Sequence, residues 1–259
     1  MTQVLAVTNQ KGGVGKTTTV ANLAAALADR GERVLAVDLD PQCSLTLSLG
    51  LRPSELVATS CELLADPDAD PRGALVALDG PEAGLDLLPA SRRLADLEPR
   101  LAQATAKELY LREALAPVLG EYAWVLIDTP PNLGVLTINA LAAAEGVLVP
   151  LQPEFLPLQG LGELSATLAL LRRYRVNPDI AIAGVVATMA TRRLVLEREV
   201  LDAAAALEVP LFDTQIPRSV RFAEAPAHGL PLVRWLPEHP GARAYRRLAE
   251  EVQGVRLPA

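Results

Sequence analysis

Hydrophobic and polar positions follow two alternating rhythms along the chain. Short continuous apolar runs, typical of strands that are covered on both faces, recur throughout. Between them lie longer segments rich in alanine and leucine, with apolar residues at helical spacing. Strand alternating with helix indicates βαβ units, so we expect an α/β fold: a mainly parallel, twisted sheet with helices on both faces. The expected strands are 4–8, 34–38, 85–88, 124–128, 146–151, 180–188 and 209–216, and the expected helices are 17–30, 106–119, 133–144, 158–175, 194–207 and 241–252.

The rhythm is interrupted at residues 66–82, which are rich in Asp, Pro and Gly. Because strands and helices resume afterwards, we interpret this stretch as a surface excursion and expect residues 1–259 to form one domain. We find no signal-peptide pattern and no apolar stretch long enough to span a bilayer, so we expect a cytoplasmic protein. Two cysteines, Cys43 and Cys61, are too few for a disulfide framework.

The net charge of −7 argues against a general nucleic-acid binder, but the charge is unevenly distributed. Residues 1–170 carry a net charge of −10, whereas residues 171–259 carry +3, and every basic residue of the latter part is an arginine. The chain has three lysines, and two of them, Lys11 and Lys16, lie in one glycine-rich segment. The basic C-terminal third is therefore the candidate surface for a polyanion.

The glycine-rich segment 10–18, QKGGVGKTT, follows the first expected strand and opens the first expected helix. This is the context of a P-loop, in which backbone N–H groups and the helix N-terminus face phosphate oxygens. Lys16 would neutralise the β- and γ-phosphates and the Thr17 hydroxyl would bind Mg²⁺. Gln10 stands where the usual pattern has its first glycine, and Lys11 is an additional lysine. The sequence thus predicts a nucleotide hydrolase with a P-loop NTPase fold and a deviant Walker A motif.

Carboxylates follow two further expected strands. Asp128 ends an apolar strand, where an acidic residue could hold a magnesium-bound water. Asp38 and Asp40 end another strand and face the same way if its geometry persists. Ligands bind beyond the carboxyl ends of such strands, so either Asp38 or Asp40 could position the attacking water.

Together these residues resemble the ParA/MinD family of P-loop ATPases, whose distinguishing mark is the extra early lysine of its deviant P-loop. Within that family the chain looks most like the short, Soj-type ParA proteins of chromosome and plasmid partition. The resemblance covers nearly the whole chain. The segments that carry it are 11–18 (KGGVGKTT), 38–42 (DLDPQ), 128–131 (DTPP), 216–221 (IPRSVR) and 241–245 (GARAY).

The resemblance implies an ATPase that forms a homodimer with ATP, with ATP and Mg²⁺ as cofactors and a weak basal activity. Lys11 would reach the partner's phosphates across the dimer interface, and Asp40 would polarise the water. The implied catalytic residues are therefore Lys11, Lys16 and Asp40. The implied nucleotide-binding residues are Lys11, Gly12, Gly13, Val14, Gly15, Lys16, Thr17, Thr18, Pro217 and Arg218, and the implied metal-binding residues are Thr17, Asp40 and Asp128.

The resemblance also implies that the ATP-bound dimer binds DNA without sequence preference, which would associate it with the nucleoid. A ParB-type partner would stimulate hydrolysis, and no membrane binding is expected. The family's DNA-contacting arginines map onto Arg193 and Arg221. Departures from the family pattern stand at Cys43, Ser44 and Ser219, where Gly, Asn and Asn are usual.

Three other readings are open to a test. A GTPase would read guanine with an [N/T]-K-x-D motif, which no lysine of this chain provides. A MinD-like membrane-positioning ATPase needs a basic amphipathic helix at the C-terminus, but the segment 249–259 is acidic before it is basic. An electron-transfer protein with a cluster at the dimer interface needs cysteines at positions that Cys43 and Cys61 do not match. The cargo, whether chromosome, plasmid or protein cluster, is not encoded in these motifs.

Overall fold

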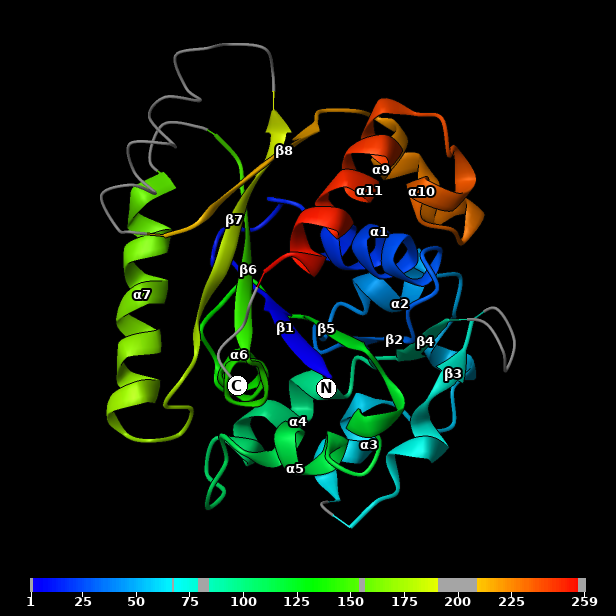
Figure 1. Ribbon diagram of the computed structural model, residues 1–259. Helices are drawn as coiled ribbons and strands as arrows, with labels where there is room; N and C mark the ends of the chain where they lie inside the picture. The colour runs from blue at the N-terminus through cyan, green and yellow to red at the C-terminus, as the bar shows by residue number, and fades with distance from the viewer. Residues whose placement is uncertain (1, 67, 79–83, 154–156, 191–208, 256–259) are drawn as a thin grey trace.

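Buried, continuous apolar runs form the central strands of a sheet (Figure 1). The computed structural model describes residues 2–66, 68–78, 84–153, 157–190 and 209–255. Within them an eight-stranded sheet has the order β3-β4-β2-β5-β1-β6-β7-β8, and only the β3–β4 pair is antiparallel. The strands are β1 (Gln3–Val7), β2 (Val34–Asp38), β3 (Val76–Ala77), β4 (Leu85–Leu88), β5 (Trp124–Asp128), β6 (Gly146–Leu151), β7 (Ala181–Ala190) and β8 (Leu211–Pro217).

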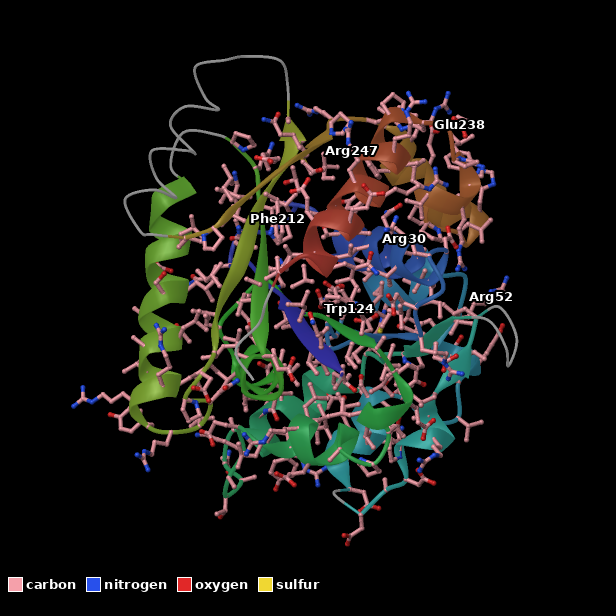
Figure 2. All side chains as sticks on the ribbon, in the orientation of Figure 1. Arg30, Arg52, Trp124, Phe212, Glu238 and Arg247 are labelled. Carbon is pink, nitrogen blue, oxygen red and sulfur yellow. The ribbon has the colours of Figure 1, made fainter. Side chains whose placement is uncertain are left out.

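Helices cover both faces of this sheet and enclose two apolar cores. Figure 1 shows α1 and α11 lying side by side on one face. Buried Trp124 and Phe212, both labelled in Figure 2, belong to the core under these helices. The first face carries α1 (Lys16–Ala28), α2 (Ser44–Ser48), α10 (Leu232–Trp235) and α11 (Pro240–Gln253), and the second carries α3 (Ser60–Ala65), α4 (Leu94–Leu101), α5 (Tyr110–Leu115), α6 (Val135–Ala143) and α7 (Pro157–Arg173).

The α/β fold with a mainly parallel sheet is confirmed, and each of the seven expected strands is present within two residues of its expected bounds at either end. The expected helix 106–119 is wrong in length, because α5 covers only Tyr110–Leu115. Ala106 has a left-handed backbone (φ +52°), and Pro117 cannot donate a helical hydrogen bond. The expected helix 194–207 lies outside the described residues. The excursion at 66–82 contributes β3, which pairs with β4 at the edge of the sheet.

The strand order places the ends of three central strands together. Asp128 at the end of β5 is in register with Asp38 of β2 on one side and with Val7 of β1 on the other. All three residues are fully buried. The segment that follows β1 therefore begins beside both acidic strand ends.

Candidate nucleotide-binding site

The segment between β1 and α1 forms an open loop suited to phosphate. Gly13 and Gly15 have left-handed backbones, with φ of +76° and +90°, which residues with side chains adopt only at a cost. A Cβ at Gly12 or Gly13 would meet no atom within 4 Å, so this side of the loop is accessible. Gly15 precedes α1 and offers no side-chain cap, which leaves the first N–H groups of the helix to an external anion.

Lys16, the first residue of α1, is 7% exposed. Its Nζ donates to the carbonyl oxygen of Lys11 at 3.4 Å. Burial lowers the pKa of Lys16, and the carboxylates of Asp128 and Asp40 oppose that effect. The structure therefore brings Lys16 to the acidic strand ends, whereas Lys11 lies exposed on the loop.

Thr17 and Asp128 place a hydroxyl and a carboxylate side by side. The Thr17 hydroxyl donates to Oδ2 of Asp128 at 2.7 Å. Oδ1 of Asp128 is buried and accepts no hydrogen bond within the described part of the chain. Burial, and secondly the neighbouring Asp38, raise the pKa of Asp128 well above its ordinary value. A hydroxyl beside a carboxylate with an unused oxygen fits Mg²⁺, which takes hard oxygen ligands and commonly only one or two carboxylates.

Asp38 and Asp40 differ sharply in their surroundings. Asp38 is fully buried, and its Oδ2 accepts from both the backbone N–H (2.9 Å) and the hydroxyl (2.7 Å) of Thr46. Its Oδ1 accepts from the backbone N–H of Asp40 at 3.0 Å. Asp40 is 8% exposed, and its Oδ1 accepts from the N–H of Gln42. Asp38 is thus committed to holding the backbone of this loop, and Asp40 is the better placed of the two to act on a ligand.

A pocket of about 260 Å³ adjoins the loop. Its lining includes Gly15 and Thr18 from the loop and the start of α1, together with Pro217 and Arg218, which are expected to bind nucleotide. The Thr188 hydroxyl donates to the carbonyl of Val14 at 2.8 Å and fastens the loop to the end of β7. The remaining lining residues are Met189, Ile216, Ser219, Val220, Phe222 and Tyr245.

Comparisons with known proteins agree with this geometry. A family model described as AAA domain matches residues 2–182. Soj, a sporulation initiation inhibitor protein of Bacillus subtilis, is 41% identical over 253 residues, which cover 97% of this chain and 98% of that protein. The chromosome partitioning protein ParA of Caulobacter vibrioides is 44% identical over 253 residues, covering 96% and 93%. The chain belongs to the ParA/MinD family of P-loop ATPases and is Soj-like.

Solved structures of similar fold also resemble this chain in sequence. A protein from Mycobacterium smegmatis described as cobyrinic acid a,c-diamide synthase, with bound ADP and magnesium, has a TM-score of 0.84 and 41% identity. The match covers 100% of this chain and 99% of that protein. MinD of Pyrococcus horikoshii, complexed with Mg-ADP, has a TM-score of 0.79 and 29% identity, with 97% of this chain and 96% of MinD covered.

Of the two arginines expected to contact DNA, only Arg221 lies within the described part of this ParA/MinD-type ATPase. Arg193 lies outside the described residues. Arg221 begins α9 (Arg221–Glu224), and its side chain is 51% exposed and pairs with Glu224 at 2.6 Å. Arg246 of α11 donates to the carbonyls of Pro237 and Val233, so it fastens the preceding loop. Arg247, on the same helix, is exposed (Figure 2).

Two of the three departures from the family pattern, Cys43 and Ser219, have local structural roles. Cys43 precedes α2 with a left-handed backbone (φ +56°), a conformation that favours glycine, the family's usual residue there. Burial raises the pKa of the Cys43 thiol to about 11. The Ser219 hydroxyl accepts from the N–H of Arg221 (3.2 Å) and lies 3.3 Å from Nε2 of His239, so it braces one wall of the pocket.

Thr188, Phe222 and Tyr245 line the pocket but carried no expected role. Tyr245 is fully buried and its hydroxyl contacts that of Thr19 at 3.1 Å. A polar tip on the apolar face of the last helix was the available signal for Tyr245.

Cys43 and Cys61 are both buried and reduced. Across the described ranges, no helix is long and apolar enough to cross a bilayer.

Proposed function

We propose that this chain is a ParA-type partition ATPase. It binds ATP with Mg²⁺ in the loop between β1 and α1, dimerises in that state and then binds DNA without sequence preference. A ParB-type partner accelerates an otherwise weak hydrolysis and releases the DNA. The observation that carries the proposal is the convergence of Lys16, Thr17 and Asp128 at one point, in a chain 44% identical to a protein named ParA. We further propose that residues 1–259 act as one domain.

The residues divide the work of hydrolysis according to their positions. Lys16 and the N–H groups of α1 hold the phosphates, and the pocket lined by Pro217 and Arg218 takes the adenine. Thr17 and Asp128, with Asp40 close by, would hold Mg²⁺, which neutralises charge on the phosphate oxygens. Asp40 accepts a hydrogen bond from the attacking water and orients it, because both oxygens of the fully buried Asp38 already accept hydrogen bonds from Thr46 and from the Asp40 N–H.

The role of Lys11 follows from its exposure. Lys16 already supplies a buried positive charge within the loop, whereas Lys11 lies on the surface beside it. A second cation that reaches the phosphates of the facing subunit would stabilise negative charge developing in the transition state. It would also make dimerisation depend on the bound nucleotide. Arg193 and Arg221 then supply phosphate contacts to DNA from both copies of the basic C-terminal third.

The decisive experiment is DNA co-sedimentation with ATP, with ADP and without nucleotide, using wild type and Asp40→Ala. Wild type should pellet with DNA in ATP only. Asp40→Ala should bind ATP, dimerise and stay on DNA, because loss of the water-orienting carboxylate blocks hydrolysis without removing the phosphate contacts. Asp213→Ala, an exposed carboxylate on β8, is the matched control and should behave as wild type.

Two outcomes would contradict the proposal. Equal pelleting with ATP and ADP would separate DNA binding from the nucleotide state. Normal turnover by Asp40→Ala would remove the water-orienting role from this residue. Liposome flotation of the ATP form tests the MinD-like alternative, and flotation without DNA binding would favour it.

A further inference from the structure

Asn9, between β1 and the phosphate loop, joins two parts of the chain that are 141 residues apart. It is 8% exposed, and its Nδ2 donates to the carbonyl of Pro150 in β6 at 2.9 Å. Its Oδ1 accepts from the backbone N–H of Lys11 at 3.0 Å. Both ends of one short amide are therefore used, by a neighbouring strand on one side and by Lys11 on the other.

The contact to Pro150 extends the sheet by one step. Thr8 donates its backbone N–H to Leu148, which is the last backbone bond between the β1 side and β6. The side-chain amide of Asn9 then reaches the carbonyl two residues further along β6. Since β6 is a buried central strand, this anchor is as rigid as the sheet itself.

Lys11 is the residue that this anchor constrains. Asn9 holds its N–H and Lys16 Nζ reaches its carbonyl, while the side chain of Lys11 lies exposed. Gly12 and Gly13 follow, and a Cβ at either would meet no atom within 4 Å, so the loop is open on that side. Glycine gives the adjoining backbone wide conformational freedom, so the direction of the Lys11 side chain depends on what holds the main chain at Lys11.

We propose that Asn9 is a positioning residue for Lys11. It holds the main chain so that the Lys11 side chain leaves the loop toward the phosphates of the facing subunit. The inference rests on the cross-interface role of Lys11 under the proposed function. It assigns Asn9 to dimer assembly and not to nucleotide affinity, because the N–H groups of the loop at 15–18 are fixed by α1 and not by Asn9.

The test is Asn9→Ala, alone and combined with Lys11→Ala. Dimerisation is followed by analytical ultracentrifugation with a non-hydrolysable ATP analogue and Mg²⁺, and nucleotide affinity by titration with a fluorescent ADP analogue. Asn9→Ala should raise the dimer dissociation constant about tenfold, because it removes both hydrogen bonds that tie the main chain at Lys11 to β6. Its ADP affinity should stay within about threefold of wild type. The double variant should dimerise no worse than Lys11→Ala.

The controls separate positioning from general stability. Asn139→Ala removes another buried asparagine, whose hydrogen bonds go to Lys107, Leu111 and Val135 and not to the loop, and should leave dimerisation unchanged. If Asn9→Ala fails to fold, Asn9→Thr, of similar volume, takes its place, because one hydroxyl cannot span both Pro150 and Lys11.

Each remaining outcome has a definite meaning. Wild-type dimerisation by the Asn9 variant would overturn the inference, and so would additive losses in the double variant. A tenfold loss of ADP affinity would also overturn it, because Asn9 would then shape the phosphate site itself. Lys11→Ala dimerising like wild type would instead show that the cross-interface role has failed, and the inference would fall with it.

Discussion

The Thr17 hydroxyl donates to Oδ2 of Asp128 at 2.7 Å, while Oδ1 of the same carboxylate is buried without a hydrogen bond in the described structure. A residue from the start of α1 and one from the end of β5 thus already lie side by side, as the proposed magnesium site requires. An arrangement of this kind needs little reorganisation to accept a cation.

Thr17→Val should therefore separate magnesium from nucleotide binding. The substitution keeps the shape of the side chain but removes its oxygen, so affinity for ATP in Mg²⁺ should fall at least about tenfold. Affinity measured in EDTA should change little, because Lys16 and the loop N–H groups remain. Isothermal titration with and without Mg²⁺ checks this, with Thr167→Val on α7 as the control. Equal losses in both conditions would contradict a metal-binding role.

Lys16 and Lys11 should fail in different ways. Lys16→Ala removes a buried charge from the phosphate site, and charge-assisted contacts are worth about 1.5–3 kcal/mol, so nucleotide binding should fall about tenfold or more. Lys11→Ala should bind nucleotide normally and lose the ATP-dependent dimer. Equilibrium binding and ultracentrifugation on both variants check the difference. ATP hydrolysis at the wild-type rate by Lys16→Ala would refute the phosphate-loop assignment.

The buried Asp38 should leave a trace in the pH dependence of stability. Burial raises the pKa of Asp38 to about 6 in the fold; the hydrogen bonds from Thr46 and from the Asp40 N–H oppose this shift, and the charge of Asp40 adds to it. Between about pH 4 and about pH 6 the folded chain keeps a proton on Asp38 that the unfolded chain has lost. The contribution of Asp38 to stability therefore falls as the pH rises through this range.

Asp38→Asn cannot lose a proton, so its free energy of unfolding relative to wild type should rise from pH 4 to pH 7. Urea denaturation at pH 4, 5, 6 and 7, in EDTA and without nucleotide, measures the difference. The variant is expected to be less stable than wild type at pH 4, because an amide has one acceptor oxygen for the hydrogen bonds that Asp38 accepts from Asp40 and Thr46. A difference that stays constant with pH would contradict the raised pKa.

DNA binding should depend on salt in proportion to the phosphates neutralised. If each subunit neutralises about two, the dimer should show a slope of log K against log salt near −3.6, about twice that of a monomer. Arg193→Ala with Arg221→Ala should flatten the slope and weaken binding on all sequences alike. Arg246→Ala is the matched control, since its guanidinium is committed to Pro237 and Val233. An unchanged slope in the double variant would move the surface elsewhere, with Arg243 and Arg247 next.

The sequence predicted the strands well because each buried strand is an unbroken apolar run between polar turns. Helices were harder to place. The helix predicted over 106–119 is interrupted by the left-handed backbone at Ala106, which no residue type in the sequence indicates. Helix α4 was missed although Leu94, Leu97 and Leu101 show helical spacing. Pro99 within it reads as a helix breaker.

The phosphate loop and Asp128 could be located from sequence because their chemistry depends on local order along the chain. Strand geometry alone left Asp38 and Asp40 equivalent, and only the family resemblance favoured Asp40, because the difference between them depends on Thr46, which reaches Asp38 from α2 and also accepts from the N–H of Ala90. The same holds for Asn9, whose second partner lies in β6. Long-range hydrogen bonds of this kind leave no periodic signal.

The site is assembled from residues that are distant in the sequence, and this ties ligand binding to folding. Thr17 meets Asp128 across 111 residues, and Val14 meets Thr188 across 174. These contacts exist only when the middle of the sheet is complete, so a partly folded chain has no competent site. Nucleotide at a hundred times its dissociation constant would add about 2.7 kcal/mol to the stability of the native chain. Bound ATP therefore protects the chain from unfolding in addition to being its substrate. The nucleotide-free chain is the form that unfolds, and so becomes open to proteolysis, most readily.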